Sequence, residues 1–158
     1  MCERVTGCAA NSELLISRHV AFFPSLADNG LSGVIPTEIR ALTSLEQFNL
    51  FSNRIRGEIP NILTELRYLE VIDFEGNLLE GPPVVNLEGL ERLNSYRVSS
   101  NLLSGSISPD IGGSVSLTEL WLAGNSITGQ IPESISKLVN LGKFLSFTVS
   151  THFISSHV

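Results

Sequence analysis

The feature that most constrains the fold is a 24-residue period that runs through the chain without an insertion or deletion. Each unit is marked by an asparagine, and the same glycine and apolar pattern surrounds each one. The five asparagines are Asn29, Asn53, Asn77, Asn101 and Asn125. A fixed period of this size indicates one supersecondary unit that is repeated and stacked. The fold therefore follows from what a single unit must bury.

Each unit contains a pattern typical of a short strand with one buried face. Apolar residues stand five and three positions before the asparagine and alternate with other residues at period two. These two columns are Phe48, Ile72, Tyr96 and Leu120, and Leu50, Phe74, Val98 and Leu122; a leucine column, Leu45, Leu69, Leu93 and Leu117, precedes them. One unit cannot cover its own leucines, so stacking must bury them and pair the strands in a parallel sheet.

A glycine and an Ile-Pro pair follow the asparagine. The glycine column (Gly33, Gly57, Gly81, Gly105 and Gly129) predicts a backbone conformation that side chains resist, or a close approach between coils. Proline has a fixed φ and no N–H, which suits entry into a short helical turn. Three units carry Ile-Pro: Ile35-Pro36, Ile59-Pro60 and Ile131-Pro132. The asparagines themselves are predicted to bond backbone groups of their own and adjacent coils, which is a structural role.

The consensus LxxLxxLxLxxNxLxGxIPxxLxxL resembles the plant-type leucine-rich repeat, and GLSGVIPTEI and SITGQIPESI are close to it. The resemblance implies an α/β solenoid: a right-handed coil with a concave parallel β-sheet, short helical or 3-10 turns on the convex side, and a second short sheet near Ile-Pro. Many members are ectodomains of receptor kinases, receptor-like proteins or small secreted inhibitors, which bind peptides or proteins along the concave face. We expect the repeat domain at 21–148, a cap-like segment at 1–20 and a tail or degenerate repeat at 149–158.

Several positions depart from the pattern. The third unit has Pro82-Pro83-Val84 in place of Ile-Pro, the fourth has Ser108-Pro109, and Ser114 replaces the leucine found in the other units, so the geometry of that flank stays open. Pro24 occupies an inward strand position, which only an edge strand tolerates. Near the C-terminus Val149 stands in place of the asparagine, and no polar capping segment follows, so a fragment is one interpretation.

The side chains between the buried strand positions are predicted to form one open face. On it an exposed tryptophan lies near acidic, basic and aromatic residues, which is the composition of a binding patch. The predicted ligand-binding residues are Asn49, Phe51, Asp73, Glu75, Arg97, Glu119 and Trp121. A second interpretation stays open, in which Trp121 covers neighbouring strands and Arg97 forms a solvated ion-pair cluster with Asp73 and Glu119.

Charge and composition exclude several classes of function. A net charge of −6 and the absence of a basic run make nucleic acid an unsuitable partner. His19, His152 and His157 lie outside the well-formed units, and no nucleophile, metal or phosphate-loop motif occurs, so we expect no enzyme, no metal site and no cofactor. No stretch reaches the roughly 20 apolar residues of a membrane span. The pattern does not predict an oligomeric state.

Two functions remain. The first is a recognition module, part of a receptor-like protein, that binds a protein or peptide on the concave face. The second is a structural segment or intracellular scaffold fragment of a longer repeat protein, with no ligand site of its own. The resemblance implies a cell-surface or extracellular location, and a disulfide between Cys2 and Cys8 because extracellular members carry a cysteine pair in a similar position; two free thiols are the alternative. The missing signal-peptide core and N-x-S/T sequon favour the intracellular alternative.

Overall fold

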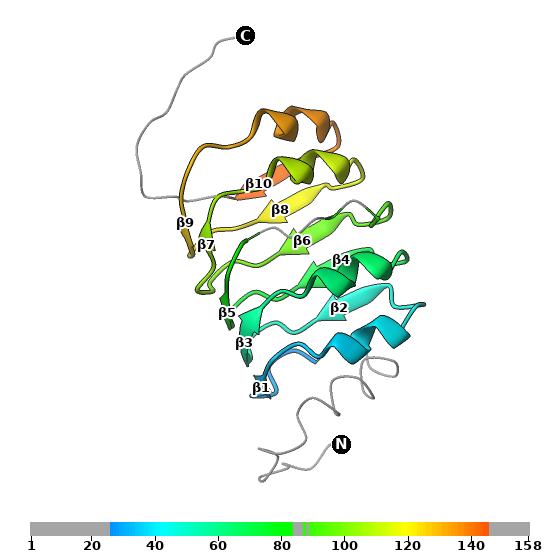
Figure 1. The fold of residues 1–158 in the computed structure, drawn as a ribbon, viewed down its shortest axis with the longest axis vertical. Coiled ribbons are helices and arrows are strands. Elements are labelled where there is room, and N and C mark those ends of the chain that lie inside the picture. Colours follow the sequence, from blue (N-terminus) through cyan, green and yellow to red (C-terminus); the bar gives the residue numbers. More distant parts are fainter. Residues whose placement is uncertain (1–25, 84–86, 88, 146–158) are drawn as a thin grey trace.

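The computed structural model describes residues 26–145 except 84–86 and 88. Within this range it shows a stack of coils in which the strands and short helices recur at the same places (Figure 1). The predicted disulfide of Cys2 and Cys8, the inward Pro24 and the segments 1–20 and 149–158 lie outside the described residues. The repeat domain predicted at 21–148 is therefore described for most of its length.

The main sheet has one strand from each coil. Its strands are β2 (Gln47–Asn49), β4 (Val71–Asp73), β6 (Ser95–Arg97), β8 (Glu119–Trp121) and β10 (Lys143–Leu145). They are parallel, in the order β10-β8-β6-β4-β2, and each residue pairs with the residue one period away, as Phe48 does with Ile72. An unbroken period with one inward face permits no other register, because a slip of one residue would turn the apolar side outward.

A second set of strands, on another side of each coil, confirms the predicted second sheet. They are β1 (Ser32–Gly33), β3 (Arg54–Glu58) and β5 (Leu78–Glu80) in one piece, and β7 (Ser104–Gly105) and β9 (Ser126–Ile127) in another. The pieces are linked by hydrogen bonds of 2.8 Å, from Leu102 N–H to the Leu79 carbonyl and from Ser104 N–H to the Gly81 carbonyl. Each column glycine has a positive φ, such as +79° at Gly57, which explains the glycine column.

The predicted helical turns are single-turn 3-10 helices: η1 (Thr37–Ala41), η2 (Asn61–Glu65), η3 (Pro109–Gly113) and η4 (Glu133–Lys137). The departures of the fourth coil leave this geometry intact. Pro109 occupies the first helical position, and the Ser108 hydroxyl caps the helix by accepting a hydrogen bond from Asp110 N–H. Ser114 N–H donates to the Ile111 carbonyl as Leu66 N–H does to that of Leu63. Backbone bonding, rather than the leucine side chain, closes the turn.

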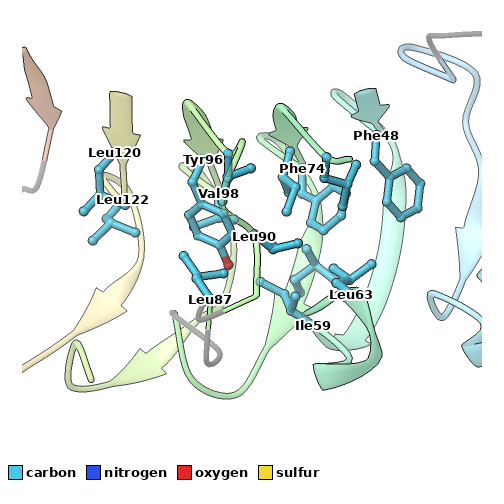
Figure 2. Packing of buried hydrophobic residues seen from close by; sticks show 14 of the residues in the cluster. Phe48, Ile59, Leu63, Phe74, Leu87, Leu90, Tyr96, Val98, Leu120 and Leu122 are labelled. Carbon is cyan, nitrogen blue, oxygen red and sulfur yellow. The ribbon is translucent and has the colours of Figure 1, made fainter. Parts of the chain in front are cut away.

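The core lies between the main sheet and the helical side, and it runs the length of the stack (Figure 2). All four residues of the column that starts at Phe48 are completely buried. Phe48 and Phe74 meet edge to face, with ring centroids 5.0 Å apart. The Tyr96 hydroxyl donates to the Pro83 carbonyl at 3.1 Å, and burial raises the Tyr96 pKa well above its usual value. A polar tip in this column is thus tolerated because it has a partner.

The buried asparagines bond two coils at once, as predicted. The Asn77 side chain donates to the Phe74 carbonyl of its own coil at 3.0 Å and to the Leu50 carbonyl of the preceding coil at 2.9 Å. Its Oδ1 accepts a hydrogen bond from Ile55 N–H at 2.9 Å. The same three kinds of bond recur at Asn53, Asn101 and Asn125. We call this set the asparagine ladder.

Removal of one ladder amide should be destabilising. We expect Asn77→Ala to lower the free energy of unfolding by about 1–3 kcal/mol, because it leaves the buried Ile55 N–H without an acceptor. Asn29→Ala is the matched control: the Asn29 side chain is exposed and, among the described residues, donates only to the Ala27 carbonyl of its own coil. Urea denaturation of both variants measures the difference. Equal losses would show that the ladder does not stabilise the stack.

Candidate ligand-binding face

The outer face of the main sheet is formed by the residues six, four and two positions before each asparagine. We call it the strand face. Its described residues are Gln47, Asn49, Phe51, Val71, Asp73, Glu75, Ser95, Arg97, Ser99, Glu119, Trp121, Ala123, Lys143 and Ala27. All seven residues of the predicted site lie on it. The parallel register places equivalent residues on neighbouring strands, so Asp73, Arg97 and Trp121 are direct cross-strand neighbours.

Arg97 is the centre of a charged network on this face. Its Nε donates to Glu119 Oε2 at 3.1 Å, a bond that Nη2 reinforces, and its Nη1 donates to Asp73 Oδ2 at 3.4 Å. Lys143 Nζ donates to the other oxygen of Glu119, Oε1, at 2.6 Å. Ser95 completes the set through a hydroxyl bond of 3.3 Å to Glu119 Oε2. Arg97 therefore pairs with Asp73 and Glu119 as the alternative interpretation predicted, but the two carboxylates are largely covered rather than solvated.

The protonation equilibria reflect this network. The pKa of Glu119 falls from 4.5 to about 2, first because Lys143 and then because Arg97 donates hydrogen bonds to the carboxylate. The bond to Glu119 raises the pKa of Arg97 above its usual value. Both carboxylates are largely covered, with side-chain exposures of 11% for Asp73 and 15% for Glu119. Glu119 and Arg97 are consequently both charged at neutral pH.

Trp121 is less exposed than the sequence predicted. The Arg97 guanidinium lies 4.9 Å from the centre of the indole ring, and the tryptophan is half-buried. Its Nε1–H is buried and has no hydrogen-bond partner among the described residues. The prediction of an exposed tryptophan was wrong because a one-strand alternation pattern does not show which neighbouring side chains fold over a residue.

The face is also more closed at its centre than its alternation pattern suggested. Asp73, Ser95 and Ser99 have exposures of 7%, 4% and 4%, although all three occupy outward positions. Short side chains on closely spaced strands are overlaid by longer ones next to them. The open face predicted from the sequence is therefore a rim of accessible side chains around a packed polar centre.

The remaining predicted residues lie on the coils before this network. Phe51 is exposed at 42%, and its N–H donates to Asn49 Oδ1 at 2.9 Å. Glu75 repeats this turn, since its N–H donates to Asp73 Oδ1 at 3.2 Å. The sequence prediction missed Lys143, which binds Glu119. The signal was present, because the 24-residue period places Lys143 directly beside Glu119 on the next strand.

The described residues show no inorganic site. They contain no group of three or more His, Cys, Asp or Glu side chains that could hold a metal ion. In the same part of the chain, no helix is long and apolar enough to cross a membrane. The strand face therefore offers hydrogen bonds, charges and aromatic rings to a ligand.

The family comparison agrees with the repeat pattern. A family model described as Leucine Rich Repeat matches residues 44–66 and 116–138. Each segment begins three residues before a main-sheet strand and ends one residue after the following 3-10 helix. No curated protein shows a significant match to the chain.

Solved structures of plant receptors are similar over most of the chain. The GASSHO1/SCHENGEN3 receptor kinase ectodomain from Arabidopsis thaliana, in complex with CASPARIAN STRIP INTEGRITY FACTOR 2, is 36% identical with a TM-score of 0.72, over 75% of this chain and 14% of its own. The Arabidopsis receptor kinase HAESA, in complex with the peptide hormone IDA and the co-receptor SERK1, is 33% identical with a TM-score of 0.71. The match covers 74% of this chain and 20% of the HAESA structure's chain. A chain of the Arabidopsis thaliana BIR3–SERK2 complex is 31% identical with a TM-score of 0.67. The match covers 79% of this chain and 69% of that chain. This chain thus spans a small part of the two receptor kinases and most of the third protein.

The network predicts an acid-dependent contribution to stability. A carboxyl group with a lowered pKa in the folded state stabilises the fold above its unfolded-state pKa and loses that effect as the pH falls through its folded-state pKa. The free energy of unfolding of the wild type relative to Glu119→Gln should be constant above about pH 5. This difference in free energy should then decline as the pH falls from 4.5 to about 2, and it should vanish below about pH 2. Denaturant titrations across this range measure it, and a difference that does not change with pH would contradict the assignment.

Proposed function

We propose that this chain, which belongs to the plant-type leucine-rich repeat proteins, is a recognition module that binds a peptide or protein segment on its strand face. The observation that carries the proposal is the fixed arrangement of Asp73, Arg97, Glu119 and Trp121. Such a group combines an aromatic anchor with charged hydrogen-bonding side chains, which is the composition of interface hot spots.

Preorganisation supports this function. The guanidinium of Arg97 is held by two carboxylates and stacked on the indole ring, so little side-chain freedom remains to be lost when a ligand binds. The Trp121 Nε1–H adds an unused hydrogen-bond donor. A peptide carbonyl that accepted this hydrogen bond after a small shift of Arg97 would satisfy a group that is unpaired in the described structure.

The comparisons support the same class of function. HAESA and GASSHO1/SCHENGEN3 are receptor kinases whose structures contain a peptide hormone and an integrity factor, respectively. The leucine-rich repeat fold itself is a ligand-binding scaffold, and we propose a non-enzymatic role for this chain. We likewise propose a protein or peptide as its partner.

One observation favours a second candidate function, a structural segment of a longer repeat array. Phe144 is 36% exposed although it stands in the inward column in which the other four coils bury their residue completely. Ile131 is 54% exposed, whereas the equivalent Ile35, Ile59 and Ile107 of other coils are only 4%, 3% and 5% exposed. Apolar positions that stacking would bury are thus uncovered at this end, as expected of a coil that docks onto another one.

The strand β8 offers a paired test of the recognition site. We expect Leu120→Ala to lower the free energy of unfolding by about 2–5 kcal/mol, because it opens a cavity in the core. Trp121→Ala removes a half-buried ring from the outer face and should cost less. Chemical denaturation measures both values. If Trp121→Ala costs as much as Leu120→Ala, the tryptophan is structural and the site hypothesis fails.

Binding is tested with a displayed library of random 12-residue peptides selected against the purified chain. Peptides that bind the strand face should lose affinity about tenfold or more on Trp121→Ala, as expected for an aromatic hot spot. Leu102→Ala is the matched control, because Leu102 is 53% exposed and lies outside the strand face. If no selected peptide depends on Trp121, the second candidate function is favoured.

A further inference from the structure

Three residues on the strand face form a column beside the Arg97 network. Phe51, Glu75 and Ser99 each stand two positions before a ladder asparagine, in three consecutive coils. Ser52 N–H donates to the Glu75 carbonyl at 2.9 Å, and Gly76 N–H donates to the Ser99 carbonyl at 3.0 Å, so the three residues lie side by side. The backbone positions that carry an aromatic ring, a carboxylate and a hydroxyl are therefore separated by the spacing of neighbouring strands, about 4.8 Å.

The carboxylate in this column lacks a counter-charge. Among the described residues the Glu75 side chain makes no ion pair, and its hydrogen bonds use only its backbone groups. The basic side chains of the strand face do not serve it, because Arg97 binds Asp73 and Glu119 while Lys143 binds Glu119. Both basic side chains are thus engaged with other carboxylates, and Glu75 stays available to a cation from outside.

A second and independent observation comes from Ser99. This residue is only 4% exposed, and its Oγ has no hydrogen-bond partner within the described structure. A buried hydroxyl without a partner is uncommon, because it has lost its hydrogen bonds to water and gained none in return. It stands beside Glu75 in the column and adds a second oxygen that can accept a hydrogen bond.

Phe51 supplies the apolar part of the column. Its side chain is 42% exposed although it lies on a strand face whose centre is packed. An exposed ring face attracts a cation and also covers the aliphatic stem of a long basic side chain. A ring next to a free carboxylate thus matches the two parts of a lysine or arginine side chain.

We infer that Phe51, Glu75 and Ser99 form a subsite for the basic side chain of a lysine or arginine in a bound peptide. The stem packs on Phe51, the cationic head binds the Glu75 carboxylate, and a donor hydrogen of the head reaches Ser99 Oγ after a small adjustment of the packing over it. The net charge of −6 favours the approach of such a ligand. This inference rests on the proposed recognition function and adds the ligand's chemistry at one position.

The experiment uses peptides selected from the random 12-residue library whose binding depends on Trp121. A recurrent lysine or arginine should appear at one position among them. Glu75→Gln should weaken their binding about fivefold or more, since charge-assisted hydrogen bonds are lost. The matched control is Glu80→Gln, which removes the same charge from an exposed residue of β5 outside the strand face. It should leave affinity unchanged.

A double-mutant cycle identifies the partner of Glu75. Replacement of the recurrent basic residue by norleucine should weaken binding to the wild type, and Glu75→Gln should then have no further effect. Peptides that depend on Trp121 but carry no recurrent basic residue would overturn the subsite and leave the recognition function standing. Equal losses for Glu75→Gln and Glu80→Gln would also overturn it. If no selected peptide depends on Trp121, both the recognition function and the subsite fail.

Discussion

The asparagine ladder is the interaction on which the rest of the structure depends. A strand that ends after three residues leaves carbonyl groups inside a turn, where water does not reach them. The Leu50 carbonyl receives hydrogen bonds from Asn53 of its own coil and from Asn77 of the next coil. Each side-chain amide therefore satisfies backbone groups in two coils and fixes the distance between them. A single deletion would move an amide away from its carbonyl, which explains why the period does not vary.

The ladder also determines where variable side chains stand. Because every coil leaves the sheet at the same turn, residues four positions before each asparagine become direct neighbours across the strands. Asp73, Arg97 and Trp121 come from positions far apart in the chain, yet they meet without any local signal between them. The position of a residue within the period thus determines where it lies on the strand face, whereas the scaffold places no restriction on the residue type there.

The sequence therefore predicted which positions repeat along the stack better than it predicted the burial and contacts of individual side chains. The buried columns and the ladder were predicted because each depends on one residue type repeated at one position. The burial of Asp73 and Ser99 was not, because it depends on the conformations of side chains on neighbouring strands. Ser114 shows the same limit from the opposite side: a polar residue in a leucine column suggested altered geometry, whereas the backbone bond to Ile111 preserves the turn. A repeat period predicts which residues are neighbours, but it does not predict their side-chain conformations or their contacts across strands.

The two halves of the strand face differ in what they leave unsatisfied. Around Arg97 every charge is paired, so a ligand there gains from shape, stacking and the free indole N–H rather than from new ion pairs. Around Glu75 a carboxylate and the Ser99 hydroxyl have no side-chain partner among the described residues, so a ligand can add electrostatic complementarity. Unpaired polar groups discriminate strongly, since a wrong partner leaves them desolvated and a right one bonds them. Affinity is accordingly expected from the tryptophan half and ligand choice from the Glu75 half.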